Sequence, residues 1–435
     1  MKLKHKNILV YGLSISGEWV SKLLLKKKAN VYLYDDDINK TKRMMMAGCY
    51  MVEKLHEDLL EQFDSIVISP SIDLDNEHIV TANRLGIRIY SELEIASLFT
   101  NNLVAVTGTN GKTTTVELIT AILNKKYKAV ACGNIGYPLS RAVIEKKRDI
   151  KVCEVSSFML EHATEFAPHV ATILNISPDH IIRHKTMERY IECKTNLYSN
   201  LNLEDYVVIN LDETIRCDKH CRQITYSVKH HADIDLKDGY IRLYGKKLVA
   251  VNELGLKGIH NIYNIMCAVA YGYIYKVSMK KMREAVIEYK SEHFRNELIA
   301  IVNDIKFIND SKSTNISSTL ASVNANKGAV ILLLGGSKKG LDYKELFDNL
   351  SKRVKKIFAF GEISDELVDR AEGFDISKVA DLKEAFKSAV DIALSRDTIL
   401  LSPASASYDQ FTSYIERGNL FNSLVREYES RTEKE

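Results

Sequence analysis

The amino-acid sequence predicts an α/β protein of three domains with mostly parallel sheets. At 435 residues the chain exceeds what a single hydrophobic core usually serves. Short apolar strands alternate with helices along most of its length. Near the middle, one strand–loop–helix unit carries the glycines of a phosphate-binding turn. We place the domains at residues 1–98, 99–292 and 293–435.

The overall composition is that of a soluble globular protein, with 46% apolar and 27% charged residues. The net charge of +3, from 60 basic and 57 acidic residues, gives no electrostatic reason to expect nucleic acid or a membrane as partner. No apolar run reaches the roughly 18 residues of a membrane span. The basic N-terminus leads into a first strand rather than a signal peptide. We expect a cytoplasmic monomer that acts on small molecules.

The seven cysteines are scattered, which suits a reducing compartment. The one cluster contains Cys217, His220 and Cys221, and no second pair follows at zinc-site spacing. The spacing therefore favours residues of a surface loop over a structural metal site.

The first domain begins with a strand–helix–strand pattern. Residues 7–11 and 31–34 form the predicted strands, and Asp35 follows the second strand. An acidic residue at that position is typical of Rossmann-like dinucleotide folds. Ser14 replaces the middle glycine of the fingerprint. A Rossmann-like domain that binds no nucleotide stays an open alternative.

The central domain begins with the phosphate-binding turn. A buried strand at 103–107 runs into Gly108-Thr-Asn-Gly111, and Lys112-Thr113 opens a helix. Backbone N–H groups and the helix N-terminus then face an anion, while the lysine and threonine serve the phosphates and Mg²⁺. Val106 stands where the general P-loop pattern has a glycine. A structural strand-to-helix turn is the alternative to the P-loop ATPase domain that we predict.

Further polar residues follow the other strands of this domain. Glu154 ends one predicted strand, His180 follows another, and Lys194 lies on the next helix. Ligands of α/β sheets bind at the carboxyl ends of the strands, so Thr113, Glu154 and His180 should share one edge. Mg²⁺ prefers oxygen ligands and tolerates imidazole. A metal site is favoured over ordinary hydrogen-bonding residues.

The third domain, 293–435, is predicted as another Rossmann-like α/β domain. Its strand ends are followed by 310–315, 335–340 and 402–407, which are rich in lysine and hydroxyl groups. Such groups suit an anionic substrate with two carboxylates. A kinase needs no third domain for a second acceptor, so an ATP-driven ligase is the better interpretation.

The chain resembles the Mur ligases over its whole length, most of all the member that adds D-glutamate to UDP-N-acetylmuramoyl-L-alanine. The motifs that carry the resemblance are Gly108–Thr114, Gly133-Asn-Ile-Gly136, Glu154-Val-Ser-Ser157, Asn175-Ile-Ser-Pro-Asp-His180, Lys194, His260-Asn261-Ile-Tyr-Asn264, Asn309–Asn315, Ser402–Phe411 and Arg417-Gly418. The resemblance implies an ATP-dependent ligase of peptidoglycan precursor synthesis that works through an acyl phosphate.

The same resemblance implies residue roles. ATP would bind Gly108, Thr109, Asn110, Gly111, Lys112, Thr113, Thr114 and Asn261, with Arg295 and Asp310 closing from the third domain. Two Mg²⁺ ions would be held by Thr113, Glu154, His180 and Lys194, the last as a carbamate. The UDP-linked substrate would contact Ile15, Ser16, Asp35 and Asn134. D-Glutamate would contact Lys312, Thr314, Lys339, Ser407 and Tyr414.

Two departures from the family pattern stand out. Ile182 replaces an aspartate, and His293 is displaced by one position before Arg295. Two alternatives remain: another ligase of this fold, such as an L-alanine-adding or folate-polyglutamating enzyme, and a non-catalytic nucleotide-gated binding protein. The third-domain motifs argue against the first, and intact Lys112, Glu154, His180 and Lys194 argue against the second.

Overall fold

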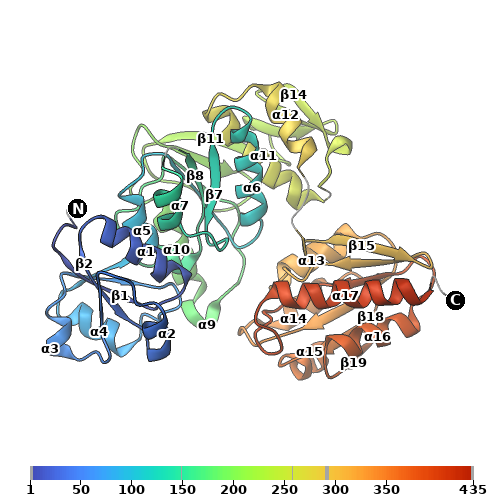
Figure 1. Ribbon diagram of the computed structural model, residues 1–435. Coiled ribbons are helices and arrows are strands. Elements are labelled where there is room, and N and C mark those ends of the chain that lie inside the picture. The colour runs from blue at the N-terminus through green and yellow to red at the C-terminus, as the bar shows by residue number, and fades with distance from the viewer. Residues whose placement is uncertain (1–2, 148, 257, 290–292, 433–435) are drawn as a thin grey trace. The chain divides into compact units, whose positions relative to one another are not determined.

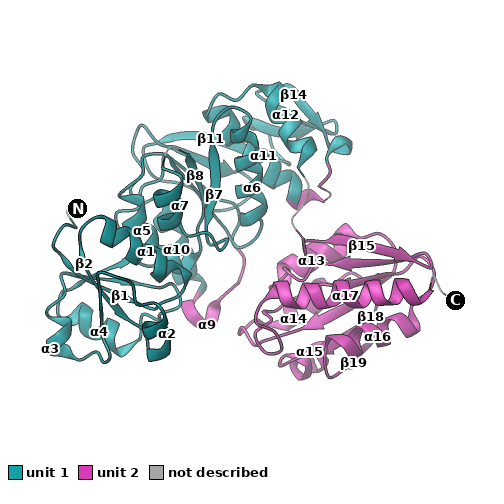
Figure 2. Ribbon diagram, in the orientation of Figure 1, with its two compact units in different colours: residues 1–176, 187–254, 261–289 teal, residues 177–186, 255–260, 290–435 magenta. Residues whose placement is uncertain are grey.

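The computed structural model describes residues 3–147, 149–256, 258–289 and 293–432. It confirms the α/β class, with three mostly parallel sheets that follow one another along the chain (Figure 1). Two compact units are present: Met1–Ile176 with Met187–Leu254 and Asn261–Tyr289, and Ser177–Thr186 with Gly255–His260 and Lys290–Glu435 (Figure 2). The first two sheets belong to the first unit and the third sheet to the second unit. The exact domain boundaries stay predictions.

The N-terminal sheet has five parallel strands in the order β3-β2-β1-β4-β5. The strands are β1 (Asn7–Tyr11), β2 (Asn30–Tyr34), β3 (Cys49–Met51), β4 (Ser65–Ile68) and β5 (Arg88–Ser91), and the helices are α1 (Ile15–Lys26), α2 (Ile38–Arg43), α3 (Glu57–Leu60), α4 (Glu77–Arg84) and α5 (Glu92–Ser97). The strand order reverses between β1 and β4, as in a Rossmann-like fold. Ile15 and Asp35 therefore lie at the edge where such folds bind ligands.

Helix α5 joins the N-terminal sheet to the central domain. The buried Glu92 carboxylate accepts a hydrogen bond from the Ser140 N–H (2.6 Å), at the start of α7 (Leu139–Glu145). Buried Glu94 accepts bonds from the N–H groups of Thr164 (3.1 Å) and Glu165 (2.7 Å). Burial raises the pKa of both carboxyl groups. Because these bonds satisfy buried polar groups on both sides, the two domains form one unit.

The central sheet has nine strands in the order β14-β13-β12-β11-β10-β9-β6-β8-β7. They are β6 (Leu103–Thr107), β7 (Ala129–Gly133), β8 (Ile150–Glu154), β9 (Val170–Ile173), β10 (Tyr206–Asn210), β11 (Arg222–Ser227), β12 (Ile234–Lys237), β13 (Tyr240–Leu243) and β14 (Lys246–Ala250). The strands between residues 206 and 250 continue the sheet of the central domain, because β10 pairs in parallel with β9. Only the last three strands pair antiparallel.

The remaining elements of this part of the chain are α6 (Lys112–Asn124), α8 (Ser157–Leu160), α9 (Ile181–His184), α10 (Met187–Thr195), η1 (Asn196–Tyr198), η2 (Val251–Glu253), α11 (Ile259–Ile274) and α12 (Met279–Glu288). The Cys217 cluster lies on a loop and His220 is exposed, as predicted, but Cys217 is not a surface residue. Cys217 is buried against the central core, and its Sγ lies 3.9 Å from that of half-buried Cys221. Residue spacing could not reveal this, because the burial comes from the fold of the loop after β10.

The third sheet has six strands in the order β15-β16-β20-β17-β18-β19, with only β15 antiparallel. Its strands are β15 (Glu297–Val302), β16 (Ile305–Asn309), β17 (Val330–Gly335), β18 (Val354–Phe360), β19 (Ile376–Lys378) and β20 (Thr398–Leu401), and its helices are α13 (Ile316–Ala325), α14 (Tyr343–Asn349), α15 (Ser364–Arg370), α16 (Leu382–Ile392) and α17 (Tyr414–Thr432). Strands β15 and β19 were not predicted from the sequence. Within the described part of the chain, every helix is too short or too polar to cross a membrane.

Candidate active site

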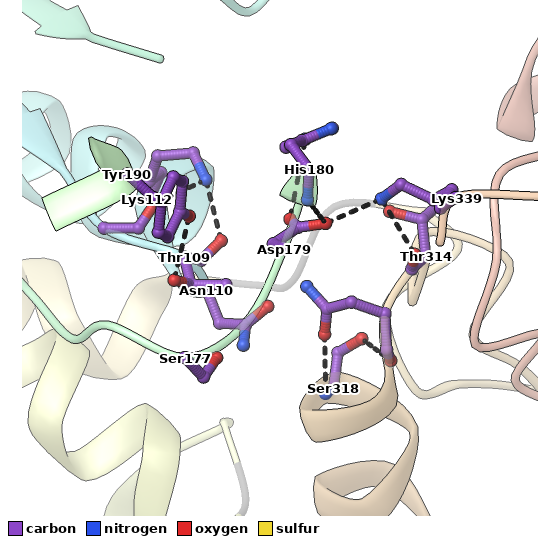
Figure 3. Close-up of polar contacts among 12 residues, drawn as sticks. Thr109, Asn110, Lys112, Ser177, Asp179, His180, Tyr190, Thr314, Ser318 and Lys339 are labelled. Atoms are coloured by element: carbon purple, nitrogen blue, oxygen red, sulfur yellow. Dashed lines mark hydrogen bonds and ion pairs between the residues drawn. The ribbon is translucent and has the colours of Figure 1, made fainter. Parts of the chain in front are cut away.

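The phosphate-binding turn lies between β6 and α6, as predicted. Strand β6 is completely buried, as expected for a central parallel strand. Gly111 caps α6 with a left-handed backbone (φ 80°), and a Cβ there would clash with the Asn264 amide. The Lys112 ammonium donates to the carbonyls of Gly108 and Thr109, both at 2.8 Å (Figure 3). Thr113 and Thr114 are buried in the first turn of α6.

Asn175, just after β9, holds the turn in shape. Its side-chain oxygen accepts from the Asn110 N–H (2.9 Å), and its side-chain nitrogen donates to the Asn110 carbonyl (3.1 Å). The Asn175 carbonyl also accepts from the Thr109 N–H (3.0 Å). The Thr109 hydroxyl lies 3.0 Å from that of Tyr190 on α10 (Figure 3). Contacts from two neighbouring elements therefore preorganise the turn for an anion.

Helix α11 supports the turn from another direction. The Thr115 hydroxyl donates to the Asn264 side-chain oxygen (3.2 Å), and the Asn264 amide donates to the Asn261 side-chain oxygen (3.2 Å). The structure thus joins Asn261, a predicted ATP ligand, to α6 through Asn264. The sequence motif contained Asn264, but we assigned it no role.

Glu154 ends β8 beside the phosphate-binding turn, since it pairs with Val106 of β6. The side chain is only 3% exposed. Its Oε1 accepts from the Asn134 amide (3.0 Å), whereas Oε2 is buried and has no hydrogen-bond partner among the described residues. A buried carboxylate oxygen without a donor is costly, and a bound cation would remove that cost. Glu154 therefore fits the predicted metal ligand.

Lys194 on α10 points at the same end of β6. The side chain is 2% exposed, and its Nζ donates to the Gly108 carbonyl (2.9 Å) and the Thr107 hydroxyl (3.4 Å). It also lies 4.7 Å from the Tyr190 ring centre. A lysine ammonium has no lone pair for a metal, so ligation requires the predicted carbamate.

His180 belongs to the second compact unit and caps α9 with a left-handed backbone (φ 55°). Its ring nitrogen lies 3.5 Å from a carboxylate oxygen of Asp179 (Figure 3). The predicted place of His180 beside Thr113, Glu154 and Lys194 stays a prediction.

The predicted nucleotide residues of the N-terminal domain lie around one loop. The Asp35 carboxylate accepts from the Leu13 N–H (2.7 Å) and the Asp37 N–H (3.0 Å), so it ties β2 to the turn after β1. Ile15 begins α1 with 47% of its surface exposed, and Ser16 follows it. Asp35 thus shapes the turn as well as lying at the ligand edge.

The predicted acceptor residues come from three loops at the carboxyl ends of β16, β20 and β17. Lys339 donates to the Asp179 carboxylate (2.8 Å) and to the Thr314 carbonyl (3.2 Å; Figure 3). The Lys312 ammonium lies 5.3 Å from the Tyr414 ring centre. Ser407 is buried after β20. The structure therefore brings Lys339 to Thr314, and Lys312 to Tyr414.

Asp310 and Arg295, the two predicted ATP residues of the third domain, both interact with residues of their own compact unit. The buried Asp310 carboxylate accepts from the Asn296 N–H (2.9 Å) and the Ser402 hydroxyl (2.8 Å), and burial raises its pKa. Arg295 lies near His260, whose pKa is lowered by burial and by the Arg295 charge. The Nδ1 atom of the displaced His293 lies 2.8 Å from a carboxylate oxygen of Glu297. Contacts of Asp310 and Arg295 with ATP stay predictions.

Comparison with known proteins identifies the family. Three family models match: "Mur ligase MurD-like, N-terminal domain" over residues 6–91, "Mur ligase middle domain" over 106–272 and "Mur ligase, glutamate ligase domain" over 294–405. A curated protein of Thermoanaerobacter sp. (strain X514), named UDP-N-acetylmuramoylalanine--D-glutamate ligase, is 35% identical over 98% of this chain and 99% of its own length. The identically named protein of Clostridioides difficile (strain 630) is 33% identical over the same shares.

This chain belongs to the Mur ligase family. Solved structures agree on the fold. MurC of Thermotoga maritima matches with a TM-score of 0.62 at 19% identity, covering 98% of this chain and all of that one. MurF of the same organism, in complex with ADP, matches with a TM-score of 0.61 at 16% identity, covering 100% of this chain and 96% of that one.

As a Mur ligase, the chain uses residues that the sequence analysis left without a role. Asn175 and Asn264 shape the turn at Gly108–Lys112, and Tyr190 contacts both Thr109 and Lys194. The sequence could have indicated a role for the two asparagines, since both lie in motifs quoted for the family. It gave no indication of a role for Tyr190, because an aromatic residue on a helix is usually packed in a core.

Proposed function

We propose that this Mur ligase joins UDP-N-acetylmuramoyl-L-alanine to D-glutamate at the expense of ATP, in peptidoglycan precursor synthesis. The observation that carries the proposal is full-length similarity, at 33–35% identity, to curated ligases named for those two substrates. The third-domain loops support it, because Lys312 and Lys339 there offer two separate cations to a dicarboxylate.

The reaction has two steps. An oxygen of the L-alanyl carboxylate attacks the γ-phosphorus of ATP, which gives an acyl phosphate and ADP. The amine of D-glutamate then attacks the acyl carbon, and the tetrahedral intermediate releases inorganic phosphate and a proton as the amide forms. The Lys112 ammonium and the loop N–H groups stabilise charge on the phosphates, so the protein acts by positioning and electrostatics.

Magnesium fits the chemistry of the central residues. Thr113, Glu154, His180 and Lys194, the last as a carbamate, would hold two ions, and the unpaired Oε2 of buried Glu154 supports this. When bound, Mg²⁺ neutralises phosphate charge. Asn134, which donates to the other Glu154 oxygen, would orient that carboxylate and reach the muramoyl substrate, while Ile15, Ser16 and Asp35 would contact the uridine diphosphate.

The acceptor would bind at the third-domain loops. A carboxylate of D-glutamate would take the place that Asp179 now has on Lys339, and the other would pair with Lys312 beside Tyr414. Thr314 and buried Ser407 supply further hydrogen bonds. With both carboxylates held, only one enantiomer directs its amine at the acyl phosphate.

The test is phosphate release from ATP in the presence of the UDP-linked precursor and one candidate acceptor. We expect turnover with D-glutamate and at least about a hundredfold less with L-glutamate, because a misplaced amine loses that much rate. Equal rates with the two enantiomers would remove the basis for naming the acceptor. Turnover with UDP-N-acetylmuramate and L-alanine would favour the L-alanine-adding alternative, and nucleotide binding without turnover would favour the non-catalytic one.

A further inference from the structure

Arg417, in the first turn of α17, is a fully buried side chain that takes part in no step described so far. Its guanidinium donates five hydrogen bonds. The acceptors are the Ser311 hydroxyl (3.1 Å) and the carbonyls of Ser311 (2.9 Å), Gly335 (3.3 Å), Ser405 (3.1 Å) and Ala406 (3.2 Å). All of these acceptors are neutral, and four of them are backbone groups.

Such a position is costly for a charge. Burial lowers the pKa of Arg417 to about 10, and the charges of Asp409 and Asp310 oppose this lowering only in part. A cation in the first turn also opposes the helix dipole. Apolar packing usually stabilises a buried position as well as a charge does, so stability alone gives no reason for an arginine here.

The acceptors lie beside the proposed D-glutamate residues. The Ser311 carbonyl directly precedes Lys312, and the Ala406 carbonyl directly precedes Ser407. The Gly335 carbonyl ends β17, at the start of the loop that reaches Lys339. One planar guanidinium thus bonds to all three loops that carry the acceptor site, with a fork geometry that a lysine cannot reproduce.

Tyr414, the predicted acceptor residue at the start of α17, belongs to the same hydrogen-bond network. The Ser311 hydroxyl, which accepts from Arg417, donates to the carbonyl of Tyr414 (2.8 Å). The loops also touch directly, because the Ser337 N–H donates to the Ala406 carbonyl (2.9 Å). A Cβ on Gly336 would clash with that same carbonyl. The loops that follow β17 and β20 are therefore closely packed against each other beside the guanidinium.

We propose that Arg417 is a positioning residue for the acceptor amino acid: its guanidinium fixes the relative places of Lys312, Lys339 and Ser407. The inference rests on the proposed function. Arg417 does not touch the acceptor, so its effect passes through the carbonyls next to those residues. Its loss should change acceptor binding and leave the ATP half of the reaction intact.

The experiment compares Arg417→Lys with the matched variant Arg426→Lys, which changes an exposed arginine of the same helix. Arg417→Lys keeps the positive charge but loses the planar arrangement of several N–H donors. We expect its KM for D-glutamate to rise about tenfold to a hundredfold, since a hydrogen bond from a charged donor is worth that much. The KM values for ATP and for the UDP-linked precursor should stay within about twofold of wild type. Arg426→Lys should match wild type throughout.

Hydroxylamine provides a second measurement. As a small nucleophile it can trap the acyl phosphate as a hydroxamate without the D-glutamate loops. Arg417→Lys should form hydroxamate at the wild-type rate. If Arg417→Lys proves unstable, Ser311→Ala, which deletes one acceptor of the guanidinium, should show the same selective rise in the D-glutamate KM, though a smaller one.

An unchanged D-glutamate KM in Arg417→Lys, or equal rises in all three KM values, would overturn the positioning role. Failure of the proposed function has a different signature, because wild-type protein would then release no phosphate in response to D-glutamate. The two failures are therefore distinguished by the wild-type control.

Discussion

The phosphate-binding turn and the three acceptor loops both present positive groups to an anion, but they are built differently. The turn is a run of consecutive residues, Gly108–Lys112. Backbone carbonyls of this run accept hydrogen bonds from the Lys112 ammonium. The acceptor site draws its residues from three segments that are far apart in the sequence, 310–315, 335–340 and 402–414, around one buried guanidinium.

This difference indicates how each site should respond to change. A local turn depends on backbone conformation and on a few fixed contacts, so a mutation there should affect one ligand strongly. A site assembled from distant loops depends on the group that joins them, so a residue without ligand contact can control affinity.

Lys112→Ala should reduce turnover by on the order of 10²-fold or more, because it removes a charge that stabilises the phosphates in the transition state. The measurement is kcat for D-glutamate-dependent phosphate release, with folding checked by circular dichroism. Lys128→Ala, which changes an exposed lysine beyond the same helix, is the matched control. Normal turnover by a folded Lys112→Ala protein would contradict the ATP-site assignment.

Lys194→Ala should lose most activity and regain part of it when short carboxylic acids are added. A free carboxylate can occupy the place of the carbamate as an oxygen ligand for Mg²⁺. The structure supplies a competing explanation, since Lys194 also bonds to the Gly108 carbonyl and could act only as a support for the turn. A loss of activity in Lys194→Ala that added carboxylic acids do not restore would favour the support role. Lys112→Ala, assayed in the same acids, should show no rescue.

Two glycine substitutions compare the regions most directly. Gly111→Ala should raise the KM for ATP about tenfold, and Gly336→Ala should raise the KM for D-glutamate by a similar factor, because each places a Cβ against a fixed polar atom at positive φ. Each variant should leave the other KM near wild type. Steady-state kinetics with both substrates would check this. A joint change of both KM values in either variant would mean that the two regions are not independent.

The α/β class, the turn at Gly108–Lys112 and the placement of polar residues after the strands could all be predicted from the sequence. These features are local, since strand and helix periods, glycine conformations and the start of a helix are set by neighbouring residues. Glu154 could be singled out for the same reason, because the last residue of a predicted parallel strand is known to face the ligand edge.

Contacts between residues far apart in the sequence became known from the three-dimensional structure. It showed that Asn175 and Asn264 brace the turn, that the 206–250 strands extend the central sheet, and that Cys217 is buried. It also showed Arg417 bonding to Ser311, Gly335 and Ala406. Periodicity fixes which face of an element is buried but not which element covers it. The family motif marked Arg417, but neither its burial nor its hydrogen-bond partners could be predicted from the sequence.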